Sequence, residues 1–280
     1  MRVELHCHSC YSKGKNLRWE AIPRPRELVR YAKKCGLGAL ALTDHNTTKG
    51  WQEAKEEAEK HGIIFIPGEE IDTQEGHLLA LGISEAVPSG LSLEETLDII
   101  RDQAAISIAP HPFDPRKQGI GFNLKRVDAV EVFNAMALDR ISNWYAERYA
   151  KKHGKPMTAG SDAHSLSMVG RATCWIPAED LDGILKQIKI GGTHLQKSYI
   201  PLPVLVDWAR ERFLRSYGQV LIRIAGYNRP KAFFASFLLK SFLLSKGRKW
   251  YWLARIGEFL AIPWSGMRLT TTFIKTLFQF

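Results

Sequence analysis

Two histidines stand at alternate positions near the start of the sequence, in the segment LHCHS. If this segment is a strand, its period of two places the imidazoles of His6 and His8 on one face. Asp162 and His164 repeat the spacing in the segment GSDAHS. Imidazole and carboxylate groups are ligands for divalent first-row metals. Either pair alone is common in ordinary strands, but the two pairs together indicate a metal site.

Further histidines and acids lie where apolar runs end. They are His45 in LTDHN, Glu69 or Glu70 in PGEEID, His77 in EGHLLALG and His111 in APHPF. One ion takes three or four protein ligands, and this chain offers six such histidines and at least two carboxylates. The sequence therefore predicts two or three divalent ions. Ions clustered about 3.5–4 Å apart can activate water and stabilise charge in phosphate-ester hydrolysis.

Short apolar runs and helical patterns alternate through residues 3–189 and must position these side chains. The runs predict strands at 3–5, 37–42, 63–66, 77–83, 106–109, 129–133, 155–159 and 172–176. The helical patterns lie at 25–35, 49–61, 93–103, 138–153 and 178–189. Repeated strand and helix indicate parallel strands covered by helices, and no GxGxxG or Walker motif marks a nucleotide-binding sheet. We expect an α/β barrel, closed or nearly so, with its chemistry at the carboxyl ends of the strands.

Taken in order, these motifs resemble those of the PHP (polymerase and histidinol phosphatase) family. They are His-x-His at 6–8, Thr-Asp-His at 43–45, Gly-x-Glu at 68–70 with a later histidine, His-Pro at 111–112 and Ser-Asp-x-His at 161–164. The resemblance covers residues 3–176 and implies a distorted seven-stranded (β/α) barrel. It also implies a trinuclear centre of Mn²⁺, Zn²⁺ or Fe²⁺ and a phosphoesterase activity. Family members act on phosphomonoesters, nucleotides or oligonucleotides.

The same resemblance assigns eight metal ligands: His6, His8, His45, Glu70, His77, His111, Asp162 and His164. One ion would take His6, His8 and Asp162. Glu70 would bridge to a second ion on His77 and His111, because the family's bridging acid follows glycine by two positions. His45 and His164 would hold a third ion.

The loop after His8 departs from the family pattern. The family usually has an Asp or a His five or six residues after His-x-His, where this chain has Lys13 or Gly14. A lysine ammonium has no lone pair for a metal, so occupancy of the third site stays open. Lys13 is instead a candidate contact for a substrate phosphate, the alternative being a solvated loop lysine.

A few other residues are weaker candidates for the site. Asn134, after a predicted strand, is a candidate to contact the metal-bound water or the substrate, the alternative being that it caps the following helix. Glu131 on the same strand is a candidate brace for a ligand histidine. Arg171, and Arg116 or Lys117, are candidates to bind a phosphate group. Beyond a metal-bound hydroxide, the sequence assigns no catalytic group.

The last 80 residues differ from the rest in charge and in aromatic content. Residues 201–280 hold 13 Lys and Arg but only three acids, which accounts for the whole net charge of +10. We therefore divide the chain into a phosphoesterase domain, 1–198, and a basic aromatic helical extension, 199–280. Within 204–280, helices that pack on the body are one interpretation. A peripheral membrane contact and a nucleic-acid contact are the others.

Composition excludes several classes of protein. The longest run without Lys, Arg, Asp or Glu has 11 residues, too short for a membrane span, and no signal peptide is evident. Four cysteines indicate a reducing, cytoplasmic location, with peripheral membrane association as a variant. The predicted function is a metal-dependent hydrolase of a phosphomonoester, nucleotide or short oligonucleotide. The alternative is a non-catalytic metal-binding scaffold or regulatory module whose basic tail binds membrane or nucleic acid.

Overall fold

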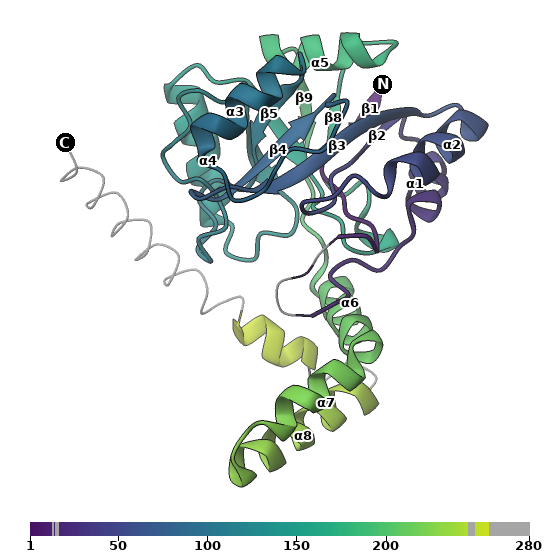
Figure 1. Ribbon diagram of the computed structural model, residues 1–280, viewed down its shortest axis with the longest axis vertical. Helices are drawn as coiled ribbons and strands as arrows, with labels where there is room; N and C mark the ends of the chain where they lie inside the picture. The colour runs from purple at the N-terminus through teal and green to yellow at the C-terminus, as the bar shows by residue number, and fades with distance from the viewer. Residues whose placement is uncertain (13, 15–16, 246–249, 258–280) are drawn as a thin grey trace, which may run out of the picture.

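The computed structural model describes residues 1–12, 14, 17–245 and 250–257. Its body is a nine-stranded sheet that curls into a nearly closed barrel, in the strand order β7-β6-β5-β4-β3-β2-β1-β8-β9 (Figure 1). The strands are β1 (Arg2–Glu4), β2 (Ala39–Leu42), β3 (Ile64–Asp72), β4 (His77–Leu81), β5 (Ile106–Ala109), β6 (Ala129–Asn134), β7 (Met157–Gly160), β8 (Thr173–Trp175) and β9 (His194–Gln196). The α/β barrel class expected from the sequence is confirmed.

The sheet is mixed and has nine strands, so the expectation of parallel strands, and the seven strands that the resemblance implies, are wrong in detail. Strand β4 runs antiparallel to both β3 and β5, and β8 runs antiparallel to β1 and β9. Strand β3 extends to Asp72, which leaves residues 73–76 as the connection to β4. A parallel crossover needs a dozen residues or more, so this short connection forces a hairpin.

The barrel approaches closure where the segments after β1 and β7 meet. Cys7 and Ala163 form a parallel bridge, and the backbone N–H of His8 donates to the Ala163 carbonyl at 2.9 Å. Gly160, the last residue of β7, lies directly beneath His6. A Cβ atom at Gly160 would lie 2.6 Å from the His6 Cβ, so only glycine fits this approach.

Five helices cover the outside of the barrel: α1 (Pro25–Lys34), α2 (Trp51–His61), α3 (Leu93–Asp102), α4 (Ile141–Lys152) and α5 (Leu181–Ile190). The capping box predicted at the start of α3 is present, since the Ser92 side chain accepts from the Glu95 N–H and Glu95 accepts from Ser92. Helix α2 ends at Gly62 in the left-handed conformation.

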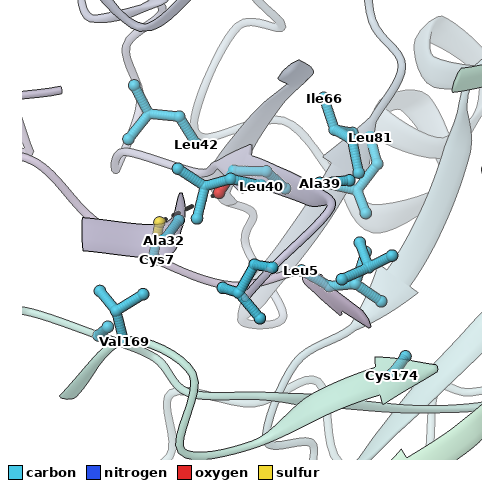
Figure 2. Close-up of a cluster of buried hydrophobic side chains, with 14 of the residues drawn as sticks. Leu5, Cys7, Ala32, Ala39, Leu40, Leu42, Ile66, Leu81, Val169 and Cys174 are labelled. Carbon is cyan, nitrogen blue, oxygen red and sulfur yellow. Dashed lines mark hydrogen bonds between the residues drawn. The ribbon is translucent and has the colours of Figure 1, made fainter. Parts of the chain in front are cut away.

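Buried apolar side chains fill the space between β1, β2 and the covering helices. Leu5, Leu40, Leu42 and Ile66 belong to this core and are at most 2% exposed (Figure 2). Cys7 packs among them, and its Sγ donates to the Ala41 carbonyl at 3.1 Å. The core thus fixes the strand that carries His6 and His8 on its other face.

Three helices and a shorter helical segment, residues 250–257, follow the barrel in the described residues. The helices are α6 (Leu202–Arg215), α7 (Tyr217–Ala225) and α8 (Arg229–Leu244). Helix α6 lies against the barrel, while α7 and α8 pack together through a small apolar cluster and extend away from it (Figure 1). Large side chains of α8 face solvent, among them Phe233, Phe234 and Phe237. No helix in the described part of the chain is both long and apolar enough to span a membrane. A membrane or nucleic-acid contact of this segment stays a prediction.

A pH-dependent ion pair joins α1 to α2. Arg30 Nε donates to Glu57 Oε1 at 2.5 Å, and this bond lowers the pKa of Glu57 from 4.5 to about 2 although burial opposes the shift. A depressed folded-state pKa stabilises the fold above the unfolded pKa. We expect this stabilisation to disappear as the pH falls from about 4.5 to about 2.

Melting temperatures of Glu57→Gln and wild type measured between pH 7 and pH 2.5 test this expectation. The difference in melting temperature between the two proteins should be largest near neutral pH and should shrink as the pH falls. Glu59→Gln, at an exposed position of the same helix, is the matched control and should track wild type throughout. A difference in melting temperature that stays constant with pH would contradict a stabilising role for the Arg30–Glu57 ion pair.

Candidate metal centre

Eight candidate ligands from six strands converge on one end of the barrel. Glu70 lies within β3 and His77 opens β4, while the others directly follow strands β1, β2, β5 and β7. All eight are at most 8% exposed: His6, His8, His45, Glu70, His77, His111, Asp162 and His164. The barrel therefore brings together every residue that the motifs singled out as a ligand.

The donor atoms form four overlapping groups whose members lie within 4.8 Å of one another. The groups are His6–His8–Glu70, His6–His111–Asp162, His8–Asp162–His164 and His45–Glu70–His77. Neighbouring imidazole rings lie 4.5–5.9 Å apart between centroids. Because each group shares a member with another, the arrangement suits several adjacent ions better than isolated ones.

Glu70 is at the middle of this cluster. Its two carboxylate oxygens lie 2.9–3.3 Å from ring nitrogens of five histidines: His6, His8, His45, His77 and His111. Oε1 faces His77 and His111, whereas Oε2 faces the other three. A carboxylate with its two oxygens directed at different sets of histidines can bridge two ions.

The electrostatics keep the carboxylates in their ligating form. Burial raises the pKa of Glu70 and of Asp162, but the surrounding histidines outweigh burial and hold both pKa values well below their ordinary range. Burial also lowers the pKa of His164 to about 4 and lowers the pKa of His45. Two carboxylates are therefore ionised and two imidazoles neutral at pH 7. Although burial opposes the shift, the same carboxylates raise the pKa of His6 and His111, and that of His8 to about 9, so an incoming metal ion would displace protons from these rings.

Buried ring nitrogens of three candidate ligands fit the binding of divalent metal ions. In the described part of the chain, Nδ1 of His111 is buried without a hydrogen-bond partner, and Nε2 of His8 and of His77 are buried 3.2 Å from carboxylate oxygens without a well-aligned hydrogen bond. Buried nitrogen atoms of this kind are costly unless something binds them. Nε2 of His8 lies 3.2 Å from a carboxylate oxygen of both Glu70 and Asp162. Divalent cations satisfy such nitrogen and oxygen atoms together.

Glu131 braces two of the candidate ligands, as the sequence predicted for one of them. Its Oε1 accepts from His6 Nδ1 at 2.9 Å, which leaves Nε2 of that ring for a metal, and its Oε2 accepts from the His111 N–H at 2.9 Å. Asn134 Nδ2 donates both to Glu131 and to Asp162, at 3.0 and 3.2 Å. Such partners fix the orientation of ligands.

The backbone is strained at two of the ligands. His111 has φ 27° and Asp162 has φ 51°, which are left-handed values that non-glycine residues rarely adopt. Strain of this kind is found at sites where the surrounding structure holds a side chain in a required direction. Here it directs a histidine and an acid from β5 and β7 toward the same cluster.

The grouping of ligands differs from the one assigned by resemblance. His45 shares a group with His77, and His164 shares a group with His8; none of the groups in the described residues places His45 beside His164. The eight ligand roles and the three-ion assignment stay predictions.

Two carboxylates at the edge of the cluster were missed. Glu20 Oε2 lies 3.9 Å from His45 Nε2, and Asp72 Oδ1 lies 3.2 Å from His77 Nε2. Asp72 follows Glu70 by two positions on β3, a spacing that could have indicated it. Glu20 follows His8 by twelve residues, well beyond the five or six at which an acid was expected.

Of the residues predicted to contact the substrate, two line a cavity beside the candidate metal centre. Lys13 lies outside the described residues. Arg116 lines a cavity beside His111 and pairs with Asp114, Nη2 to Oδ2 at 2.6 Å. Asn134 lines the same cavity. Arg171 is directed elsewhere, since its Nε donates to the Ser167 carbonyl.

Comparison with known proteins gives two family matches. Residues 4–116 match the family described as PHP domain, and residues 140–193 match the one described as PHP-associated. Two uncharacterized proteins of Methanocaldococcus jannaschii are 40% and 36% identical, over 151 and 182 residues. The alignments cover 51% and 61% of this chain and 87% and 69% of those proteins. A 5′-3′ exoribonuclease of Haemophilus influenzae is 31% identical over 163 residues, 57% of this chain and 54% of the enzyme.

Two solved structures share the fold. One is a two-domain protein from Bacteroides vulgatus, described as containing a predicted PHP-like metal-dependent phosphoesterase, with a TM-score of 0.58 and 19% identity. The match covers 76% of this chain and 69% of that one. The other is PsfC from Pseudomonas syringae, with a TM-score of 0.55, 22% identity, and coverage of 75% and 97%.

Proposed function

Because the chain belongs to the PHP family of metal-dependent phosphoesterases, we propose that its histidine and carboxylate centre hydrolyses a phosphomonoester, a nucleotide or a short oligonucleotide. The observation that carries the proposal is the position of Glu70, with carboxylate oxygens within 3.3 Å of five histidines. Two or three ions of Mn²⁺, Zn²⁺ or Fe²⁺ would be held by the eight candidate ligands.

The divalent ions, when bound, supply an activated water and stabilise the negative charge that develops on the phosphoryl group. The chain's own residues prepare the site for this chemistry. Glu131 holds a proton at His6 Nδ1 and keeps Nε2 directed inward. Glu70 and Asp162 remain ionised among the histidines, and Arg116, paired with Asp114, lines the adjoining cavity.

The relatives favour a phosphate ester as the substrate, but they do not distinguish a phosphomonoester from a phosphodiester. The exoribonuclease of H. influenzae acts, by its name, on RNA from the 5′ end. This chain aligns with only about half of that enzyme, so a phosphodiester substrate is one arm of the test below. The basic helices after residue 200 are consistent with an anionic partner but do not select one.

Metal content and turnover of the full-length protein test the proposal together. We expect two or more divalent ions per chain by elemental mass spectrometry. We also expect hydrolysis of p-nitrophenyl phosphate or bis-p-nitrophenyl phosphate that stops with EDTA and returns with Mn²⁺. The ratio of the two rates distinguishes a monoesterase from a diesterase. Fewer than one ion per chain, with neither ester hydrolysed, would overturn the proposal and favour the non-catalytic scaffold.

A further inference from the structure

A cavity of about 700 Å³ lies between the metal centre and the C-terminal helices. Its barrel side includes His111, Arg116 and Asn134. Its helical side includes Arg212 and the apolar side chains of Leu205, Val206, Trp208, Ala209, Phe242 and Leu253. Figure 1 shows α6 directly beside the barrel and the helical segment after α8 returning toward it. The volume is within the range of pockets that enclose small-molecule ligands.

The cavity reaches the metal centre directly. His111, a candidate ligand, is part of its lining, and so is Asn134, whose Nδ2 lies 3.2 Å from Asp162 Oδ2. A molecule with its phosphate at the centre would therefore place the rest of its body between the barrel and the helices. This geometry makes the helical wall a candidate for recognising the leaving group.

The helical wall is fixed to the loop that follows His8. Trp208 Nε1 donates to the Glu20 carbonyl at 3.0 Å, and the Trp208 ring lies edge-on to His164, 5.2 Å between centroids. Arg212 Nε donates to the Trp19 carbonyl at 3.0 Å, and its guanidinium lies over the Trp208 ring. The wall is thus anchored beside the metal centre.

Polar side chains of the lining already have partners within the protein. Asp139 accepts from both the N–H and the hydroxyl of Ser142, at 2.7 and 2.9 Å. Asn134 is bonded to Glu131, and Arg116 is paired with Asp114. On the helical side, Arg212 donates from Nε to the Trp19 carbonyl and lies over the Trp208 ring, so most of what that wall offers to a ligand is apolar surface. A nucleobase would leave its polar edge largely unpaired there, which is costly, whereas an alkyl or aryl group gains from burial.

We propose that the C-terminal helices form the leaving-group pocket of the centre, and that the substrate is a phosphomonoester with an apolar alkyl or aryl body. The inference rests on the proposed function and names its substrate class. Water adds to phosphorus, the bond from phosphorus to the alcohol oxygen breaks, and the alcohol leaves with a proton from that water. The products are inorganic phosphate and an apolar alcohol.

Binding of non-hydrolysable phosphonates to the Mn²⁺-loaded full-length protein tests the pocket without turnover. Calorimetry with methylphosphonate, butylphosphonate and hexylphosphonate should give affinities that rise about two- to fourfold for each added methylene. Equal affinities along this series would overturn the inference. Adenosine monophosphate binding more tightly than hexylphosphonate would also overturn it, in favour of a nucleotide pocket.

Two variants locate the effect. Ala209→Phe fills the cavity and should remove most of the gain with chain length, while Leu214→Phe, at an exposed position of the same helix, should keep it. Leu253 is 54% exposed, so Leu253→Ala should fold, and it should weaken hexylphosphonate several-fold but leave methylphosphonate unchanged. Length-dependent binding that survives in both Ala209→Phe and Leu253→Ala would place the apolar group elsewhere and refute the pocket.

Hydrolysis of the matching alkyl phosphates separates this inference from the proposed function. Length-dependent binding without turnover of any ester would leave the pocket in place and refute the esterase. Turnover of p-nitrophenyl phosphate with no dependence on alkyl length would retain the esterase and refute the apolar pocket.

Discussion

Replacing Glu70 with glutamine is expected to lower the turnover of a phosphate ester on the order of a thousandfold. The side chain keeps its size but loses its charge and one of its two acceptor oxygens. A metal ion contributes several kcal/mol of transition-state stabilisation, and a loss of about 4 kcal/mol corresponds to about three orders of magnitude in rate. The metal content should fall by at least one ion per chain.

The neighbouring acid provides a matched control for this substitution. Glu69 is equally buried, but its Oε2 accepts from the Val87 N–H on the other face of β3. Glu69→Gln retains an oxygen for this bond and should keep wild-type metal content and turnover. A Glu70→Gln protein within tenfold of wild type, with all of its metal, would show that Glu70 does not bridge the ions.

Glu131→Gln is expected to reduce metal affinity and turnover by about 10- to 100-fold, the usual effect of losing a partner that orients metal ligands. Both Glu131 oxygens are in use, one at His6 Nδ1 and the other at the His111 N–H and at Asn134. A glutamine has one carbonyl oxygen and one amide nitrogen. At one of these positions its N–H donor would therefore face another hydrogen-bond donor, and that hydrogen bond would be lost.

A titration with Mn²⁺ distinguishes this indirect role from direct ligation. Because Glu131 acts through His6 and His111, raising the Mn²⁺ concentration should restore part of the activity of Glu131→Gln but little of that of Glu70→Gln. Glu147→Gln, which loses a surface ion pair with Lys151 and Lys197, is the control, and its activity should depend on the Mn²⁺ concentration as that of wild type does. An unchanged Mn²⁺ requirement for Glu131→Gln would exclude the bracing role.

The sequence predicted the barrel class and the residues of the cluster because both depend on local patterns. Histidines at strand ends are visible as motifs, and the period of two fixes which face of β1 they share. The predicted parallel direction of β4 was wrong. Strand β3 continues past the apolar run 63–66, through Pro67 and two acids, to Asp72, and this leaves too short a connection for a parallel crossover. Strand β9 was missed because it has three residues and no apolar alternation.

Other parts of the site depend on contacts between distant segments, which a single sequence does not reveal. Trp208 and Glu20 are 188 residues apart, yet they share a hydrogen bond beside the centre. The helical pattern of α6 indicated an apolar face but not that part of it would line a cavity shared with His111. For the same reason, the sequence suggested membrane, nucleic acid or packing for the extension, and not a wall of the site.

The bridge between Cys7 and Ala163 also sets the order in which the protein can assemble during synthesis. His6 and His8 emerge from the ribosome more than 150 residues before their neighbours Asp162 and His164. Contacts of such long sequence separation form slowly, because a large loop must close first. A nascent chain that ends before His164 therefore exposes an incomplete set of candidate ligands. The complete set of candidate ligands exists only after the barrel has come together.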